Sequence, residues 1–185
     1  MLWRTTVTLN AAAHSSHARD VANPGVLPAL LIAFIAADTL AGAWFFQLVL
    51  DIRPCPLCLE QRYAYYLAVP LGLALAFAAS RRAPQSVLLA GFAALLLAAL
   101  ANAWLGGYHA GVEWKFWEGP TDCSGPIVNL GSAGNLLERL DTEKVIRCDE
   151  VQWRFLGLSL AGYNVLISLA MAAIAVWGIV SAKRA

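Results

Sequence analysis

The sequence predicts an all-α integral membrane protein, a bundle of four membrane-spanning helices. Its hydrophobic fraction is 59% and its charged fraction only 14%, whereas soluble domains average about 25% charged residues. The apolar residues also come in long blocks, and a helix needs about 20 residues to cross the hydrocarbon core of a bilayer. The net charge of +1 gives no electrostatic basis for binding nucleic acid.

The apolar blocks predict one domain, residues 27–182, that contains all four spans. The spans are expected over residues 27–50, 57–79, 87–108 and 155–180. Pro70 lies inside the second span, and membrane helices tolerate such a kink. Residues 1–26 are mostly polar and lack the features of a cleavable signal peptide, so they are predicted to be a flexible cytoplasmic tail. Two histidines in this tail, His14 and His17, are interpreted as solvated side chains.

The charge distribution predicts that both termini are cytoplasmic. No acidic residues neighbour Arg81-Arg82, in the short loop between the second and third spans, or Lys183-Arg184, after the last span. Basic residues of the two remaining loops are mixed with acidic ones, so the positive-inside rule places the termini in the cytoplasm. The outer loops are then a short one, residues 51–56, and a long one, residues 109–154. In the long loop, residues 136–140 predict a short amphipathic helix, which either lies along the membrane surface or packs on the bundle.

All four cysteines fall in the outer loops or at a helix mouth: Cys55, Cys58, Cys123 and Cys148. An even number of cysteines facing an oxidising compartment indicates disulfide chemistry. Their pairing cannot be read from their spacing.

The first two cysteines form a Cys55-Pro56-Leu57-Cys58 motif at the start of the second span. Pro56 suits the first helical position, which places Cys55 near the N-cap and Cys58 in the first turn. Free backbone N–H groups and the helix dipole favour a thiolate there, and thiolate character makes a cysteine redox-active. Arg62 follows Cys58 by four residues on the same helix face, where it can stabilise a nearby anion.

The other two cysteines leave structural readings open. A Cys123–Cys148 bridge would close about two dozen residues and contribute about 3 to 4 kcal/mol as a passive staple. Glycines at 125, 131 and 134 instead favour a pliable loop that presents a disulfide to another protein. Four cysteines also suit zinc, although this second pair lacks metal-ligand spacing.

Three stretches of sequence combine these features. They are Cys55-Pro56-Leu57-Cys58-Leu59-Glu60-Gln61-Arg62, then Cys123, then Arg147-Cys148-Asp149-Glu150 followed by Trp153-Arg154-Phe155-Leu156-Gly157-Leu158-Ser159. Together with the four spans, they resemble the disulfide bond formation protein B (DsbB) family over nearly the whole chain after the tail.

The resemblance implies a thiol:quinone oxidoreductase of the bacterial inner membrane. It implies that Cys123 is attacked by a periplasmic thioredoxin-fold dithiol oxidase similar to DsbA, and that Cys148 is its bonded mate at rest. It further implies that Cys55 and Cys58 reoxidise that pair, with Cys58 and Arg62 facing a membrane quinone and His109 nearby. Ubiquinone is preferred to menaquinone as the expected cofactor. No metal is expected.

The resemblance also explains why a strong electron acceptor is required. The relay from DsbA through DsbB to quinone is the established means by which the periplasm is kept oxidising. DsbA has a potential of about −120 mV and structural disulfides lie below about −300 mV, a gap of about 8 kcal/mol in a two-electron couple. An ordinary structural Cys123–Cys148 bridge would therefore not oxidise such a partner unless a stronger acceptor follows it.

Alternative functions remain open from sequence alone. The chain also suits a DsbB-like paralogue with one dedicated partner, a non-catalytic scaffold with two structural disulfides, or a metal-binding membrane protein. Vitamin K epoxide reductase-like proteins are similar in their four helices and two cysteine pairs, but usually carry the CxxC near the last helix. Asp38, near the middle of the first span, is read either as part of a proton path or as a residue bonded to Asn102 or Asn164.

Overall fold

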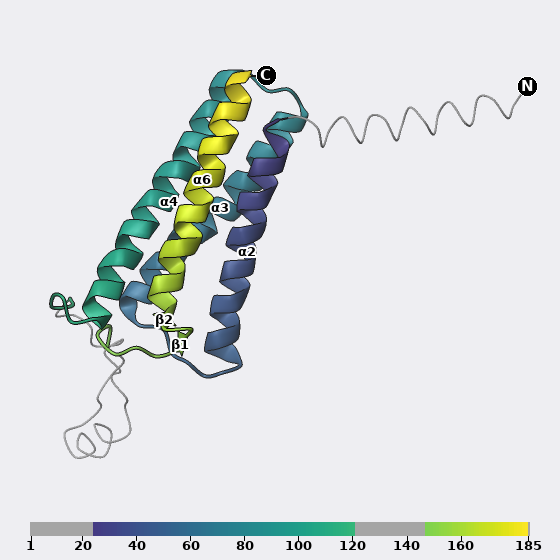
Figure 1. Ribbon diagram of the computed structural model, residues 1–185. Helices are drawn as coiled ribbons and strands as arrows, with labels where there is room; N and C mark the ends of the chain where they lie inside the picture. Colours follow the sequence, from purple (N-terminus) through teal and green to yellow (C-terminus); the bar gives the residue numbers. More distant parts are fainter. Residues whose placement is uncertain (1–23, 121–146, 185) are drawn as a thin grey trace, which may run out of the picture.

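The computed structural model describes residues 24–120 and 147–184 of the chain. Four helices run alternately up and down in a bundle (Figure 1). They are α2 (Val26–Leu48), α3 (Pro56–Ser80), α4 (Gln85–Glu113) and α6 (Leu160–Arg184). All four are long and apolar enough to cross a membrane, which confirms the predicted fold class.

The helix boundaries depart from the predicted spans mainly at the Cys55 end of the bundle. Helix α4 continues to Glu113, one turn beyond the expected end at 108, and α6 begins at Leu160 rather than at 155. The loop predicted over residues 109–154 is therefore shorter at its start. Its expected amphipathic segment, residues 136–140, lies outside the described residues, as does the tail before residue 24.

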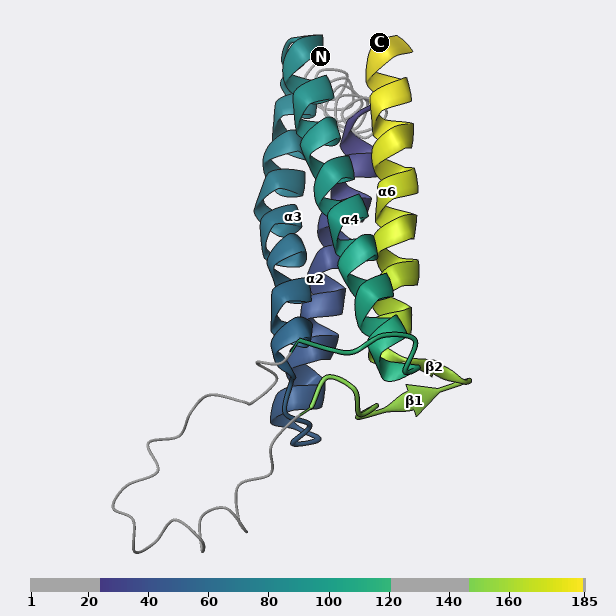
Figure 2. The same ribbon diagram turned by 90° about the vertical axis from the view of Figure 1, so that its left-hand side faces the viewer.

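A small β-hairpin replaces the predicted first turn of the last helix (Figure 2). Strand β1 (Arg154–Phe155) pairs antiparallel with β2 (Leu158–Ser159). The two residues between them, Leu156 and Gly157, have φ values of 49° and 84°, the left-handed pair that a tight two-residue hairpin turn requires. A hydropathy pattern assigns this apolar run to a span because hydropathy carries no information about turn geometry. Helix α6 therefore begins after the hairpin, at Leu160.

The bundle interior is built largely from small side chains, whereas many large apolar side chains face outward. Gly72 illustrates the close packing, because a Cβ there would lie 3.0 Å from the carbonyl oxygen of Ala29 on α2. Trp104 and Phe34 are instead 82% and 69% exposed. Small residues at helix contacts and large apolar ones outside suit a bundle surrounded by lipid.

A polar cluster at the centre of the bundle joins three helices. The Tyr65 hydroxyl of α3 donates to Asn164 Oδ1 of α6 at 2.5 Å. Asn102 Nδ2 of α4 donates to the same oxygen at 3.1 Å and to Ser168 Oγ at 3.0 Å. The expected contact of these asparagines with Asp38 is therefore absent. Asp38 lies on the exposed side of α2 because the helix turns its small residues, not this carboxyl, toward the core.

The two ends of the bundle differ in chemistry. Basic side chains lie at the end where α3 and α6 finish, namely Arg81, Arg82, Lys183 and Arg184. Exposed aromatic side chains gather at the opposite end: Trp114, Phe116, Trp117 and Phe155. Aromatic residues of this kind favour the membrane–water interface. The cysteines that the structure describes lie at the aromatic end.

Candidate active site

The two cysteines of the CxxC motif meet at the N-terminus of α3, as the sequence predicts. Cys55 is the N-cap, with an extended backbone (φ −73°, ψ 166°), and Pro56 follows as the first helical residue. Cys55 Sγ accepts a hydrogen bond from the backbone N–H of Cys58 at 3.3 Å and donates one to Cys58 Sγ at 2.9 Å. Both sulfurs therefore share the positive end of the helix dipole.

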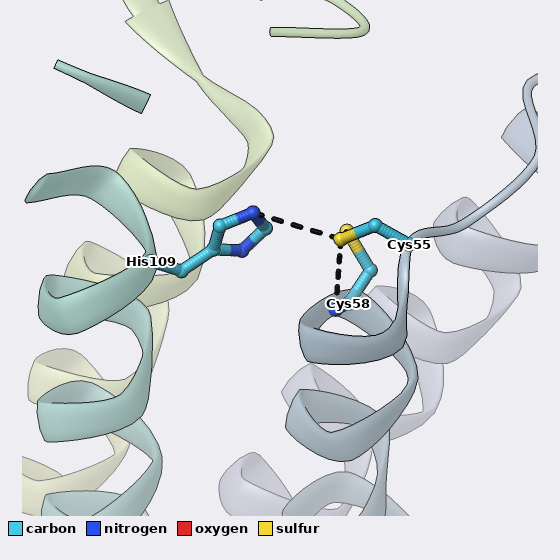
Figure 3. Close-up of side chains that lie close together, drawn as sticks. All are labelled: Cys55, Cys58 and His109. Atoms are coloured by element: carbon cyan, nitrogen blue, oxygen red, sulfur yellow. Dashed lines mark hydrogen bonds between the residues drawn. The ribbon is translucent and has the colours of Figure 1, made fainter. Parts of the chain in front are cut away.

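His109 of α4 faces this dithiol across the bundle (Figure 3). Its Nε2 lies 3.6 Å from Cys55 Sγ, and its Nδ1 lies 2.9 Å from the side-chain nitrogen of Gln61. The imidazole is only 3% exposed. Because Gln61 fixes one ring nitrogen, the other is held against the thiol, where it can give or take a proton.

Glu113 extends the contacts of His109 toward α6. It lies one turn beyond His109 on α4, with Oε1 3.9 Å from Nε2. Its other carboxyl oxygen accepts a hydrogen bond from the Ser159 hydroxyl, and Ser159 Oγ in turn accepts from the backbone N–H of Gly162 at 3.2 Å. Ser159 thus caps α6 and brings the buried carboxyl to the positive end of that helix.

Arg62 is a buried cation, 9% exposed, whose contacts are made with α2. Its Nη1 donates to Gln47 Oε1 at 2.7 Å and its Nη2 to the carbonyl of Ala43 at 3.4 Å. The guanidinium also lies 5.5 Å from the centre of the Trp44 ring. Among residues 24–120 and 147–184, no carboxylate forms an ion pair with Arg62, so its charge remains available to an anion.

A cavity of about 370 Å³ lies beside these groups, within the size range of small-molecule sites. Its wall comes mainly from α2, α3 and α6, and it is largely apolar. The polar side chains that reach it include Cys55, Cys58, Gln61, Arg62, Tyr65, His109, Glu113 and Asn164. Phe46, Trp153 and Phe155 line it near the aromatic end. The dithiol and the buried cation therefore border one apolar chamber.

Cys148, near the C-terminal end of the long loop, packs against the dithiol. It is 1% exposed and packs in one cluster with Cys55, Leu57 and Val112, with Cys58 at the edge. Its backbone also hydrogen-bonds His109. Its expected partner, Cys123, lies outside the described residues.

Ion pairs anchor the segment that carries Cys148. Asp149 Oδ2 lies 2.6 Å from Lys115 Nζ and 2.8 Å from Arg147 Nη2. These two cations lower the pKa of the Asp149 carboxyl from 3.8 to about 2, and the hydrogen bond from Arg147 has the larger effect. Lys115 follows Trp114, the C-cap of α4, so the ion pairs link the chain around Cys148 to the helix that carries His109.

Sequence reasoning singled out the four cysteines, Arg62 and His109 as candidates but missed the residues that contact them. Gln61, Gln47 and Ser159 gave no signal because each acts through a distant segment. Glu113 did give a signal in the sequence, since its spacing of four residues from His109 places both side chains on one helix face. Of the six candidate residues, the structure brings together Cys55, Cys58, Cys148 and His109, with Arg62 bordering the same cavity.

This arrangement defines a class of protein: a membrane-spanning helical bundle with thiol–disulfide chemistry at one end. Comparison with known proteins gives the family. The model of the family "Disulfide bond formation protein DsbB" matches residues 26–178. The chain belongs to the DsbB family and is a disulfide bond formation protein.

Individual relatives agree with the family model. Disulfide bond formation protein B of Hahella chejuensis is 31% identical over 166 residues, covering 83% of this chain and 92% of the relative. The protein of the same name from Azoarcus sp. is 31% identical over 165 residues, covering 81% and 90%. That of Nitrosococcus oceani is 31% identical over 149 residues, covering 78% and 85%. The similarity therefore extends across the whole bundle.

Proposed function

We propose that this protein is a thiol:quinone oxidoreductase that reoxidises a periplasmic, DsbA-like dithiol protein. The observation that carries the proposal is the position of the Cys55–Cys58 dithiol on the wall of an apolar cavity, beside a buried cation. A passive disulfide needs neither the cavity nor the cation. Membership of the DsbB family supports the same chemistry.

The two thiols of the CxxC motif have unequal roles. The pKa of the Cys55 thiol is raised above its usual range, chiefly because it donates a hydrogen bond to Cys58 and further because burial disfavours the thiolate. Cys55 therefore keeps its proton, while Cys58 accepts that hydrogen bond at the helix N-terminus. Negative charge is best stabilised on Cys58, which makes Cys58 the sulfur that leaves and donates electrons.

The cavity fits a quinone ring by its chemistry. Its apolar wall suits a lipid-soluble molecule, and Arg62, held by Gln47, supplies a fixed positive charge. Arg62, Cys58 and His109 are the residues that would hold the head group. When bound, the quinone would supply a two-electron, two-proton acceptor for the reduced Cys55–Cys58 pair. His109 Nε2 lies where it can move the Cys55 proton, and Glu113 Oε1 lies 3.9 Å from the same ring nitrogen.

The loop cysteines would pass electrons inward from the partner. The partner dithiol attacks a Cys123–Cys148 disulfide at Cys123, forms a mixed disulfide, and releases Cys148 as a thiolate. Cys148, packed against Cys55, then attacks the Cys55–Cys58 disulfide at Cys55 and releases the Cys58 thiolate. The second thiol of the partner attacks the mixed disulfide, so that the oxidised partner leaves and Cys123 is freed as a thiolate. Cys123 then attacks the Cys148–Cys55 disulfide at Cys148 and releases the Cys55 thiolate, which takes up a proton. The Cys123–Cys148 disulfide is re-formed, the partner has lost two electrons, and the Cys55–Cys58 pair has gained them.

We place the protein in the bacterial inner membrane with both termini in the cytoplasm. The basic end of the bundle, with Arg81, Arg82, Lys183 and Arg184, would face the cytoplasm by the positive-inside rule. The CxxC motif and Cys148 lie at the opposite, aromatic end. That end would face the oxidising periplasm, where the partner is found.

The test is quinone reduction by purified, detergent-solubilised protein supplied with a reduced DsbA-like protein and followed by quinone absorbance. Turnover should disappear in separate Cys58→Ser and Cys123→Ser variants, and running the assay with ubiquinone and menaquinone decides between the two. Full activity without Cys58 would exclude this route of electrons. Absence of turnover with every quinone and partner, while the protein stays folded, would favour a scaffold with structural disulfides.

A further inference from the structure

Three soft metal-ligating atoms converge at the N-terminus of α3 (Figure 3). The Sγ atoms of Cys55 and Cys58 and a ring nitrogen of His109 all lie within 4.8 Å of one another. Two donors come from α3 and one from α4, so the bundle itself holds them together. We propose that the reduced protein binds one thiophilic d10 cation, such as Zn²⁺, at these three atoms, and that the bound cation blocks the dithiol.

The distances suit tetrahedral coordination with a small adjustment. Zinc–sulfur bonds of about 2.3 Å and zinc–nitrogen bonds of about 2.0 Å place sulfur and nitrogen ligands about 3.5 Å apart, and two sulfurs about 3.8 Å apart. Cys55 Sγ and His109 Nε2 are already 3.6 Å apart. The sulfurs are 2.9 Å apart, so the Cys58 side chain must rotate outward, into the cavity that it lines.

The charges of the site balance on binding. Each thiol releases its proton to water and forms a metal–sulfur bond, so two thiolates neutralise a divalent cation. His109 coordinates as neutral imidazole through Nε2. No electron moves, and the protons are the only leaving groups. A buried centre without net charge avoids the large cost of isolating an ion from water.

The surroundings of His109 supply the second layer that metal-bound histidines require. A histidine that binds metal through Nε2 carries its proton on Nδ1 and donates it to an oxygen. Gln61 is 2.9 Å from Nδ1, and rotating its amide by half a turn presents the oxygen instead of the nitrogen. A water molecule, which adds no charge, can take the fourth position, and Glu113 Oε1, 3.9 Å from Nε2, is placed to accept a hydrogen bond from it.

The metal and the disulfide exclude each other because they use the same sulfurs. Once Cys55 and Cys58 are bonded to one another, no thiolate remains for the cation. A cation bound to the reduced pair holds it reduced, and this inhibition of turnover rests on the function proposed above. Binding itself needs only the geometry. Hard cations such as Mg²⁺ prefer oxygen ligands and are not expected to bind these donors.

Binding can be tested without any enzymatic assay. The protein would carry His14→Ala, His17→Ala, Cys123→Ser and Cys148→Ser, which remove every other histidine and cysteine of the chain. After reduction, we expect one Zn²⁺ per protein in competition with a chromophoric chelator. Co²⁺ in its place should show the intense thiolate-to-metal absorption of a tetrahedral site. Gln61→Ala should weaken binding about 10- to 100-fold, and His109→Gln should weaken it more.

Reoxidising the same background protein to the Cys55–Cys58 disulfide is the control that requires no further substitution, and it should abolish binding. Equal Zn²⁺ affinity in the oxidised protein, or a cobalt spectrum without thiolate absorption, would overturn the proposal. Equal affinity in the His109→Gln variant would likewise remove His109 from the site. Zinc binding without quinone reduction in the wild type would refute the proposed function alone, whereas quinone reduction without zinc binding would refute this inference alone.

Discussion

His109 Nε2 lies 3.6 Å from Cys55 Sγ although the two residues are 54 positions apart in the sequence. The contact joins the start of α3 to the last turns of α4, and Gln61 fixes the opposite edge of the ring. A buried imidazole held against a thiol has the geometry of a proton carrier.

Replacing His109 with glutamine should therefore slow turnover. General acid–base groups typically contribute about 10²- to 10⁴-fold to rate, so a loss in kcat of about 10²-fold or more is expected in the quinone-reduction assay. The matched control is His14→Gln in the tail, which should keep the wild-type rate. An unchanged rate in His109→Gln would show that protons leave Cys55 by another route.

The hydrogen bond between the two thiols predicts an order of alkylation. The raised pKa of Cys55 keeps this thiol protonated through the neutral range. Iodoacetamide should therefore label Cys58 first in the reduced protein at pH 7 to 8, just below the ordinary cysteine pKa of about 8.5. Cys58→Ala removes the largest cause of that raised pKa. The pKa of Cys55 should then fall, and its labelling at a given pH should become faster than in the wild type.

Mass spectrometry of labelled peptides across a pH series measures both effects. Equal rates of labelling for the two thiols would contradict the assigned roles. A Cys55 rate that does not respond to Cys58→Ala would show that burial, not the hydrogen bond, controls this thiol.

The buried charge of Arg62 predicts a specific defect in quinone binding. Hydrogen bonds to charged groups contribute about 1.5 to 3 kcal/mol, so Arg62→Gln should raise the KM for quinone about 10- to 150-fold. Arg81→Gln, at the opposite end of the bundle, serves as the control and should behave as wild type. A loss of kcat with an unchanged KM would instead place Arg62 in the chemical step.

Much of the site could be predicted because it depends on local sequence. The helix start at Cys55 and Pro56 and the four-residue step from Cys58 to Arg62 are both set by neighbouring residues. Long apolar blocks likewise predict four spans, since the requirement for length and hydropathy is met within each helix.

What escaped prediction depends on contacts between distant segments. Cys148 packs beside Cys55, and ion pairs of Asp149 link its segment to the residues after α4. The start of α6 escaped because a left-handed turn at Leu156 and Gly157 stops an apolar run from forming helix. The outward position of Asp38 follows from helix rotation, which packing decides and hydropathy does not.

The ion pairs of Asp149 predict an unusually acidic carboxyl. Its pKa is lowered to about 2 by Arg147 and Lys115, so the pairs should persist as the pH falls and be lost only as it passes through about 2. Lys115→Ala removes one cation and should move the pKa upward, toward the ordinary value of about 3.9. Carbon-13 NMR of the aspartate carboxyls follows the titration directly. A midpoint near the ordinary value in the wild type would mean that the pairs do not form in solution.

The central polar cluster predicts a measurable contribution to stability. Tyr65→Phe removes the hydroxyl that donates to Asn164 at 2.5 Å and leaves the ring in place. Hydrogen bonds between membrane helices contribute on average about 0.6 kcal/mol and at most about 1.7 kcal/mol, so the free energy of unfolding in mixed micelles should fall by an amount in that range. Tyr63→Phe is the matched control. Tyr63 is 69% exposed, so this variant should leave stability unchanged.

Equal stability of the two variants would mean that water or a neighbouring group replaces the lost donor. A larger fall would indicate that Tyr65 orders Asn102 and Asn164 together, because its hydroxyl and Asn102 Nδ2 both donate to Asn164 Oδ1.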